Sequence, residues 1–369
     1  MQTGKKIRVL VVDDSAFMRR VLQGIITSDP QLEVCGEAKD GRDAVTQAET
    51  LKPDVVSMDI NMPVMDGIQA TEIIMSQNPR PILIVSSESR DGAAVTLKAL
   101  QLGAIDFVPK PSNGIDLDMT SVRDELCRKL KMAAKVRVVR PATRSKPAET
   151  NGKHPAPVAT KQSSAVSLPR PGGKFPIVVV ASSTGGPATW MKLAPYFGPD
   201  FPAAVLVVQH MPGNFTGQFS QQLAEVAQIK VKEAEGGEII TPGQIYVCPG
   251  SHHMRVLPNG RIALDDGPRI NGYRPCADVA FESAAEFAGP LTIGVILTGM
   301  GNDGAKGVQA IKAAGGHTIA QDESTAVIFG MPQEAIKTGA VDQVLPIESI
   351  YQAVERRLTS VFAGRVGAM

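Results

Sequence analysis

Two long stretches of this chain alternate short apolar runs with helical patterns, and this alternation restricts the fold more than any other feature. In residues 5–133 the apolar runs are IRVLVV, LEVCGEA, DVVSMD, PILIVSS and AIDFVPK. Helical patterns such as AFMRRVLQGIITS and GIQATEIIMSQ stand between them. Alternation at this spacing is typical of a parallel α/β sheet. We therefore expect a first domain over residues 5–133 with five parallel strands.

The same alternation returns in residues 175–369. The strand-like runs there are FPIVVVAS, AAVLVVQH, GQIYVCPG, LTIGVILTG and GHTIAQD, with helical patterns such as TGQFSQQLAEVA between them. Glycine-rich turns follow several of these runs. The pattern predicts a second, doubly wound and largely parallel α/β domain over residues 175–369.

Residues 136–174 have a different composition. Six prolines, eight Lys or Arg and one Glu occur there, with no aromatic residue and little periodicity. Such a composition predicts a flexible linker. A basic arm that binds nucleic acid is an alternative, but the segment lacks the aromatic side chains that stack on bases. The whole chain has a formal net charge of only +1, so we expect no nucleic-acid partner.

The remaining composition is that of a globular intracellular protein. The four cysteines are scattered without a CxxC pair, which fits a reducing cytoplasm. The apolar run at 291–299 is far shorter than the roughly 20 residues that cross a bilayer. We expect a cytoplasmic monomer without membrane insertion.

Acidic residues end two of the first domain's apolar runs, and a lysine ends another. Asp13 and Asp14 follow IRVLVV, Asp59 ends DVVSMD, and Lys110 lies in DFVPKP. Carboxyl ends of parallel strands meet at one edge of the sheet, where clustered acids repel unless a divalent cation joins them. Capping of helices by these acids is the alternative, but it does not account for the lysine.

This arrangement predicts a phosphoacceptor site. We expect Asp13, Asp14, Asp59 and the backbone carbonyl of Asn61 to hold Mg²⁺, with Asp59 free to accept a phosphoryl group. Ser86 and Lys110, at the ends of two other runs, would contact the phosphoryl oxygens.

The motifs VVDDS, MDINMPVMDG, VSS and DFVPKP resemble the receiver domain of bacterial response regulators. The resemblance covers about residues 5–130 and implies a flavodoxin-like (βα)5 fold. It also implies phosphorylation of Asp59 by a histidine kinase. Ser86 and Phe107 would then re-pack as a switch. Receivers usually have Thr where this chain has Ser86.

Three reactive side chains follow strand-like runs of the second domain. Ser183 follows FPIVVVAS, His210 follows AAVLVVQ, and Asp303 lies in the turn after LTIGVILTG. A serine in a strand-to-helix turn suits a nucleophile, histidine a general base, and a carboxylate can hold the imidazole by its Nδ1–H. Each residue alone is more often structural, but together they predict a catalytic triad.

A dinucleotide site is an alternative for the third segment. Gly299, Gly301 and Gly304 form a GxGxxG pattern between a strand and a helix, and Asp322 lies about 20 residues further on. Against it, Asp303 occupies the turn where a pyrophosphate would sit, and two anions would compete for the helix N-terminus.

The motifs ASSTGGP, QHMPGNFT, YVCPGSHHM, ILTGMGNDG and FGMPQEA resemble the catalytic domain of chemotaxis protein-glutamate methylesterases. The resemblance implies Ser183 as nucleophile, His210 as base, Asp303 as orienting acid and the Met300 backbone N–H as oxyanion donor. Its substrates would be glutamate methyl esters and glutamines of chemoreceptors, with no cofactor. Ser182 also precedes the Thr-Gly-Gly motif, but Ser183 keeps the spacing that the family has.

Joining a receiver to an esterase suggests regulation by docking. We expect the receiver to cover the mouth of the catalytic site and phosphorylation to release it. A DNA-binding output is the alternative from another class, but no segment has the pattern of a basic recognition helix. A scaffold without catalysis would tolerate replacement of Ser183, His210 and Asp303.

Overall fold

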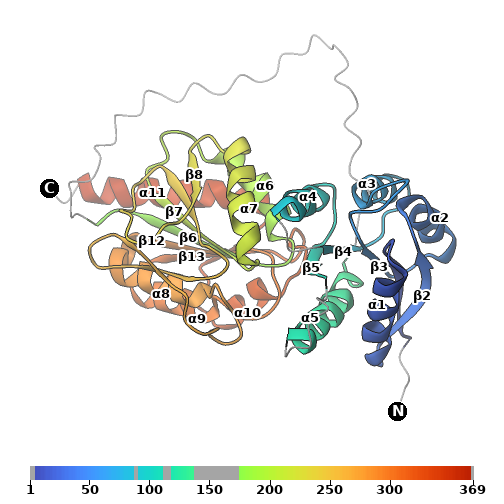
Figure 1. Cartoon of the computed structure of the whole chain (residues 1–369). Coiled ribbons are helices and arrows are strands. Elements are labelled where there is room, and N and C mark those ends of the chain that lie inside the picture. Colours follow the sequence, from blue (N-terminus) through green and yellow to red (C-terminus); the bar gives the residue numbers. More distant parts are fainter. Residues whose placement is uncertain (1–4, 87–89, 111–117, 137–173, 367–369) are drawn as a thin grey trace, which may run out of the picture.

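The computed structural model describes residues 5–86, 90–110, 118–136 and 174–366, which form two α/β units (Figure 1). Nearly all of the predicted linker at 136–174 lies outside these residues, so the domain bounds stay a prediction. No helix in the described part of the chain has the length and apolar content that a membrane span needs.

The first unit is a five-stranded parallel sheet in the order β2-β1-β3-β4-β5, as expected for a flavodoxin-like fold. Helices cover both faces, so the strands are almost continuously buried, as four successive residues of β1 are. The elements are β1 (Ile7–Val12), α1 (Ala16–Ser28), β2 (Leu32–Ala38), α2 (Gly41–Leu51), β3 (Val55–Met58), α3 (Gly67–Gln77), β4 (Ile82–Ser86), α4 (Arg90–Gln101), β5 (Asp106–Pro109) and α5 (Asp118–Ala133).

The second unit is a seven-stranded parallel sheet in the order β14-β13-β12-β6-β7-β9-β8. Strand β6 lies between β12 and β7, so the loops after these three strands are neighbours. The sheet and the helices around it consist of β6 (Ile177–Ser182), α6 (Gly186–Leu193), β7 (Ala204–Gln209), α7 (Gly213–Val226), β8 (Lys230–Glu233), β9 (Gln244–Val247), α8 (Ala277–Ala288), β12 (Thr292–Ile296), α9 (Ala305–Ala313), β13 (His317–Gln321), α10 (Met331–Lys337), β14 (Gln343–Leu345) and α11 (Ile347–Val366).

The two-domain α/β prediction is therefore confirmed, but several short strands were missed. An antiparallel ribbon, β10 (His253–Val256) with β11 (Ile262–Asp265), lies outside the large sheet. His253 begins β10. Edge strands β8 and β14 carry partly or fully exposed polar residues, so they lack the apolar run by which a buried strand is recognised.

The two units pack against each other through α4, which lies beside α6 and α7 (Figure 1). Leu97 and Leu100 of α4 belong to the same buried apolar cluster as Phe219 of α7. Phe107 of β5 stacks on Phe215 of α7, with ring centroids 4.3 Å apart. This apolar interface holds β5 and α5 close to the loops that follow β6 and β7.

Candidate functional site

The predicted acidic cluster forms at the carboxyl end of the first sheet. One carboxylate oxygen from each of Asp13, Asp14 and Asp59 lies within 4.8 Å of the others. Asp13 and Asp59 are buried and Asp14 is exposed, so the cluster opens to solvent on one side. Three hard oxygen donors at this spacing fit a magnesium ion. Asn61 is exposed, two residues beyond Asp59.

Lys110 partly neutralises this cluster. Its Nζ lies 2.8 Å from Asp13 Oδ2 and 2.9 Å from Asp59 Oδ2. Burial lowers the pKa of Lys110, but the two carboxylates outweigh burial and leave the pKa raised, so the lysine stays cationic. The Lys110 backbone N–H donates to the Ser86 carbonyl oxygen at 2.8 Å, which joins the ends of β4 and β5. Ser86 and Lys110, which we expect to contact the phosphoryl group, therefore lie side by side at the ends of two paired strands.

The other predicted switch residue, Phe107, does not face solvent. It is 3% exposed because its ring stacks on Phe215 at the domain interface. Re-packing of Phe107 would therefore disturb the contact between the two units directly.

The predicted catalytic residues lie at the ends of the three neighbouring strands of the second sheet. Ser183 follows β6, His210 follows β7, and Asp303 lies in the loop between β12 and α9. Backbone bonds join these ends: the His210 N–H donates to the Ser182 carbonyl at 2.9 Å, and the Ser183 N–H to the Thr298 carbonyl at 3.0 Å. Ser183 and His210 line the same cavity.

Asp303 holds the His210 ring through a nitrogen other than the expected one. His210 Nε2 lies 2.7 Å from Asp303 Oδ2. Nδ1, which we expected to face Asp303, is buried and makes no hydrogen bond within the described residues. The N–H groups of Ala277 and Asp278 hold the Asp303 carboxylate in place, and in that place it meets Nε2. Nδ1 is therefore the nitrogen left to accept a proton.

Several donors keep the Asp303 carboxylate ionised. The backbone N–H groups of Ala277 and Asp278, at the start of α8, donate to it at 2.6 and 3.1 Å. Burial acts to raise the pKa of Asp303, but His210 and these N–H groups outweigh it, so the pKa lies below the ordinary value. The Cys276 thiol lies 3.1 Å from Asp303 Oδ1, and burial and that carboxylate raise the thiol pKa to about 12, so the S–H donates.

The structure distinguishes the two neighbouring serines. Ser182 is fully buried, and its hydroxyl donates to Gln209 Oε1 at 2.6 Å. Ser183 is partly exposed and faces the cavity. Gln209 also donates from Nε2 to the carbonyl oxygens of Ser183 and His210, at 2.9 and 3.1 Å. Ser182 and Gln209 therefore tie together the turns that carry the candidate nucleophile and base.

The glycines of the GxGxxG pattern are explained by close packing. A Cβ on Gly299 would lie 2.8 Å from Ser183 Cβ, and one on Gly301 would lie 1.9 Å from the Tyr273 hydroxyl oxygen. Gly304 has φ of +92°, and a Cβ there would lie 2.5 Å from Ile296 Cδ1. The Asp322 carboxylate accepts from Ser324 and Thr325 in its own turn. These contacts explain the GxGxxG glycines and Asp322 without a bound dinucleotide.

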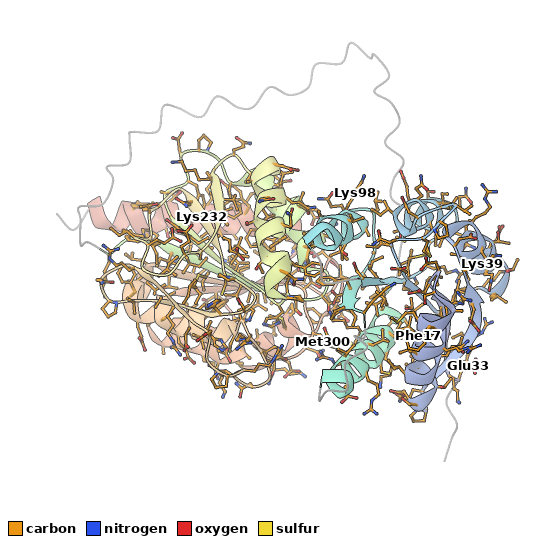
Figure 2. All side chains as sticks on the ribbon, in the orientation of Figure 1. Phe17, Glu33, Lys39, Lys98, Lys232 and Met300 are labelled. Carbon is orange, nitrogen blue, oxygen red and sulfur yellow. The ribbon has the colours of Figure 1, made fainter. Side chains whose placement is uncertain are left out.

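Both units line the cavity in which Ser183 lies, and its volume is about 430 Å³. Its wall in the second unit includes Ser183, His210, Tyr273 and Met300; Met300 faces the first unit near α5 (Figure 2). The first unit contributes Phe107, Pro109, Val122, Glu125, Arg128 and Lys129, from β5 and α5. The docked first unit therefore forms part of the wall around the candidate catalytic residues.

Four residues of this site were not predicted from the sequence: Asp106, Gln209, Tyr273 and Cys276. The Thr184 hydroxyl donates to Asp106 Oδ2 across the domain boundary, and Tyr273 stacks on His210. A usable signal existed for Tyr273, because Asn271-Gly272 directly before it is a strong turn dipeptide. Nothing local marks Cys276 or Asp106, whose partners are distant in the chain.

Known proteins resemble this chain along both units. A model of the CheB methylesterase family matches residues 178–354, and one of the response regulator receiver domain matches residues 9–120. A protein of Pyrococcus abyssi named protein-glutamate methylesterase/protein-glutamine glutaminase is 45% identical over 98% of this chain and 96% of its own. Relatives with the same name from Symbiobacterium thermophilum and Thermotoga maritima are 46% and 43% identical, over 95% and 94% of this chain and 97% of each relative. Because such identity extends along both units, this chain belongs to the protein-glutamate methylesterase/protein-glutamine glutaminase family.

Proposed function

We propose that this chain is a serine hydrolase that removes methyl groups from glutamate methyl esters of chemoreceptors and is activated by phosphorylation. The observation that carries the proposal is the 2.7 Å contact between His210 and Asp303, beside a partly exposed serine in one cavity. The names of the relatives support the ester substrate and the release of methanol.

The proposed reaction uses three side chains. His210 Nδ1, which lacks a partner among the described residues, takes the proton of the Ser183 hydroxyl as Ser183 Oγ attacks the ester carbonyl. Asp303 keeps the ring in place and stabilises the imidazolium. His210 then gives the proton to the leaving methanol, and water cleaves the acyl-enzyme to free glutamate. The same steps with ammonia as leaving group would deamidate glutamine.

The developing oxyanion needs donors beside Ser183. We assign the backbone N–H of Met300 to this role, because Met300 lines the same cavity in the loop after β12. The proposed esterase chemistry uses no cofactor.

The receiver would control access to this reaction. Receiver domains in general are phosphorylated with Mg²⁺ by a histidine kinase. In this chain Asp13, Asp14, Asp59 and the Asn61 carbonyl would hold the ion, which would neutralise the incoming phosphoryl oxygens. Asp59 would accept the group.

Ser86 and Lys110 would contact the phosphoryl group, and Phe107 would pass the change to the interface. Its stack on Phe215 supports this role. A tenfold shift between docked and open states needs only about 1.4 kcal/mol of differential contact. We also propose that the protein acts as a cytoplasmic monomer, on the cytoplasmic helices of its receptors.

Methanol release from methylated receptor, with and without a small phosphodonor and Mg²⁺, tests the proposal. We expect slow release from the unphosphorylated chain and faster release after phosphodonor addition. Ser183→Ala should abolish release in both states, whereas Asp59→Asn should remove only the stimulation. Near-normal release by Ser183→Ala would exclude the triad.

A further inference from the structure

Tyr273 contacts the proposed general base but has no role in the mechanism described above. Its ring stacks on the His210 imidazole, with centroids 4.7 Å apart and ring planes 19° apart. Both rings line the cavity that contains Ser183. The contact therefore covers one face of the imidazole, while the ring edge carries Nε2, which meets Asp303, and Nδ1, which has no hydrogen-bond partner among the described residues.

A tight turn presents Tyr273 in this position. Ile270 and Tyr273 exchange backbone hydrogen bonds of 3.0 and 2.9 Å, and the two residues between them have φ of +51° (Asn271) and +86° (Gly272). Positive φ at both central positions is the type I′ geometry that Asn-Gly favours. The backbone at Tyr273 is thus held independently of His210.

The chain on either side of Tyr273 is also anchored to the catalytic loop. The Tyr273 hydroxyl packs against Gly301, where a Cβ would lie 1.9 Å from its oxygen. Three residues later, Cys276, Ala277 and Asp278 all donate to the Asp303 carboxylate. One short segment therefore holds the partner of His210 and covers the face of its ring.

We propose that Tyr273 is a positioning residue for the hydrolysis reaction, and this rests on the proposed function. Its ring fixes the rotation of the His210 imidazole so that Nε2 meets Asp303 and Nδ1 is left without a competing partner among the described residues. The aromatic face also stabilises the imidazolium that forms when His210 takes the serine proton.

Two effects should follow if the ring is lost. A misdirected base slows the chemical step by about 10- to 100-fold with little change in KM. Loss of the cation–π contact disfavours the protonated ring, so the acid limb of the pH profile of kcat/KM should move to lower pH. A contact of about 0.5–2 kcal/mol corresponds to a movement of about 0.4–1.5 pH units.

The charged groups around His210 are the same in each variant. They are Asp303 on its Nε2 side and, along the cavity, Glu125, Arg128, Lys129, Arg269 and Arg274. Their contribution to the acid limb therefore cancels when variants of Tyr273 are compared.

The experiment uses the full chain treated with phosphodonor and compares Tyr273→Leu with the matched control Tyr273→Phe, which keeps the ring. We expect Tyr273→Leu to lose kcat and to shift the acid limb, and Tyr273→Phe to stay within about threefold of wild type without a shift. If Tyr273→Leu fails to fold, Tyr273→Met provides an unbranched replacement of similar length.

Three outcomes would overturn the proposal: unchanged kcat in the aliphatic variant, a loss of kcat with no movement of the acid limb, or an equal loss in Tyr273→Phe. The wild-type protein tests the proposed function separately. If wild type releases no methanol, the proposed function is excluded. If wild type is active and Tyr273→Leu has the same kcat and pH profile, only the proposed role of Tyr273 is excluded.

Discussion

The Thr184 hydroxyl donates a hydrogen bond to the Asp106 carboxylate, so the residue directly after Ser183 is bonded to the receiver. Thr184 is 4% exposed and Asp106 9% exposed, so water does not compete strongly for this contact. Lys129 of α5 lies 3.2 Å from Asp106 Oδ2 and forms an ion pair with it. The receiver therefore contacts the turn that carries the candidate nucleophile, besides lining the cavity.

Thr184→Val should raise the activity of the unphosphorylated protein. The substitution removes a hydrogen bond to a charged group, worth about 1.5–3 kcal/mol, from the docked state only, so basal methanol release should rise about tenfold or more. Rates after phosphodonor treatment should be similar for both proteins. Thr189→Val is the matched control, because that hydroxyl donates at 2.9 Å to Gly185 in its own unit. An unchanged basal rate in Thr184→Val would show that this contact does not hold the docked state.

Ser182→Ala should reduce stability more than it reduces activity. Its hydroxyl is buried and donates to Gln209 Oε1, and removal leaves that oxygen unsatisfied, at a cost of about 1–3 kcal/mol in the free energy of unfolding. Ser183→Ala, on the partly exposed serine, should change stability by less than about 0.5 kcal/mol. Urea unfolding and methanol release measured on both variants should give opposite rankings. The same ranking in both assays would contradict the assignment of the two serines.

Gly186→Ala should disturb both the fold and the site. A Cβ at this position would lie 2.0 Å from Gln209 Oε1 and 2.9 Å from Ser182 Cβ, and such overpacking costs about 1–3 kcal/mol. Gln209 would have to move, and its amide holds the carbonyls of Ser183 and His210, so methanol release should fall as well. Gly198→Ala is the control, since nothing lies within 4 Å of a Cβ there. Equal stability of the two variants in thermal unfolding would be inconsistent with this packing.

The contribution of Asp303 to stability should depend on pH in a defined direction. Its folded-state pKa lies below the ordinary value of 3.8, so the unfolded chain takes up the proton first as the pH falls. The stabilisation is therefore fully present above pH 3.8 and is lost as the pH falls through the folded-state value. We expect Asp303→Asn to lower the free energy of unfolding by a constant amount between about pH 5 and 7. Denaturant unfolding across this range checks it, and a penalty that shrinks from pH 7 to pH 5 would contradict it.

The fold and the positions of the candidate residues could be predicted because they depend on local patterns. Apolar runs that form strands of four to six residues mark buried parallel strands, and parallel strands bring the reactive side chains that follow them to one edge of the sheet. This placed Asp13 and Asp59 together, and likewise Ser183, His210 and Asp303. Strands β8 and β14 could not be found in this way, because edge strands with exposed residues lack the apolar run.

The finer geometry depended on contacts between segments that are distant in the chain. The ring nitrogen that faces Asp303, the burial of Ser182 beside Gln209, the stack of Tyr273 on His210 and the bond from Thr184 to Asp106 each join different loops or domains. Local sequence patterns specify which strands and turns form, because period and turn chemistry act over a few residues. Which atoms then meet is set by the packing of complete elements, so it can be known only once the two sheets and their loops are assembled.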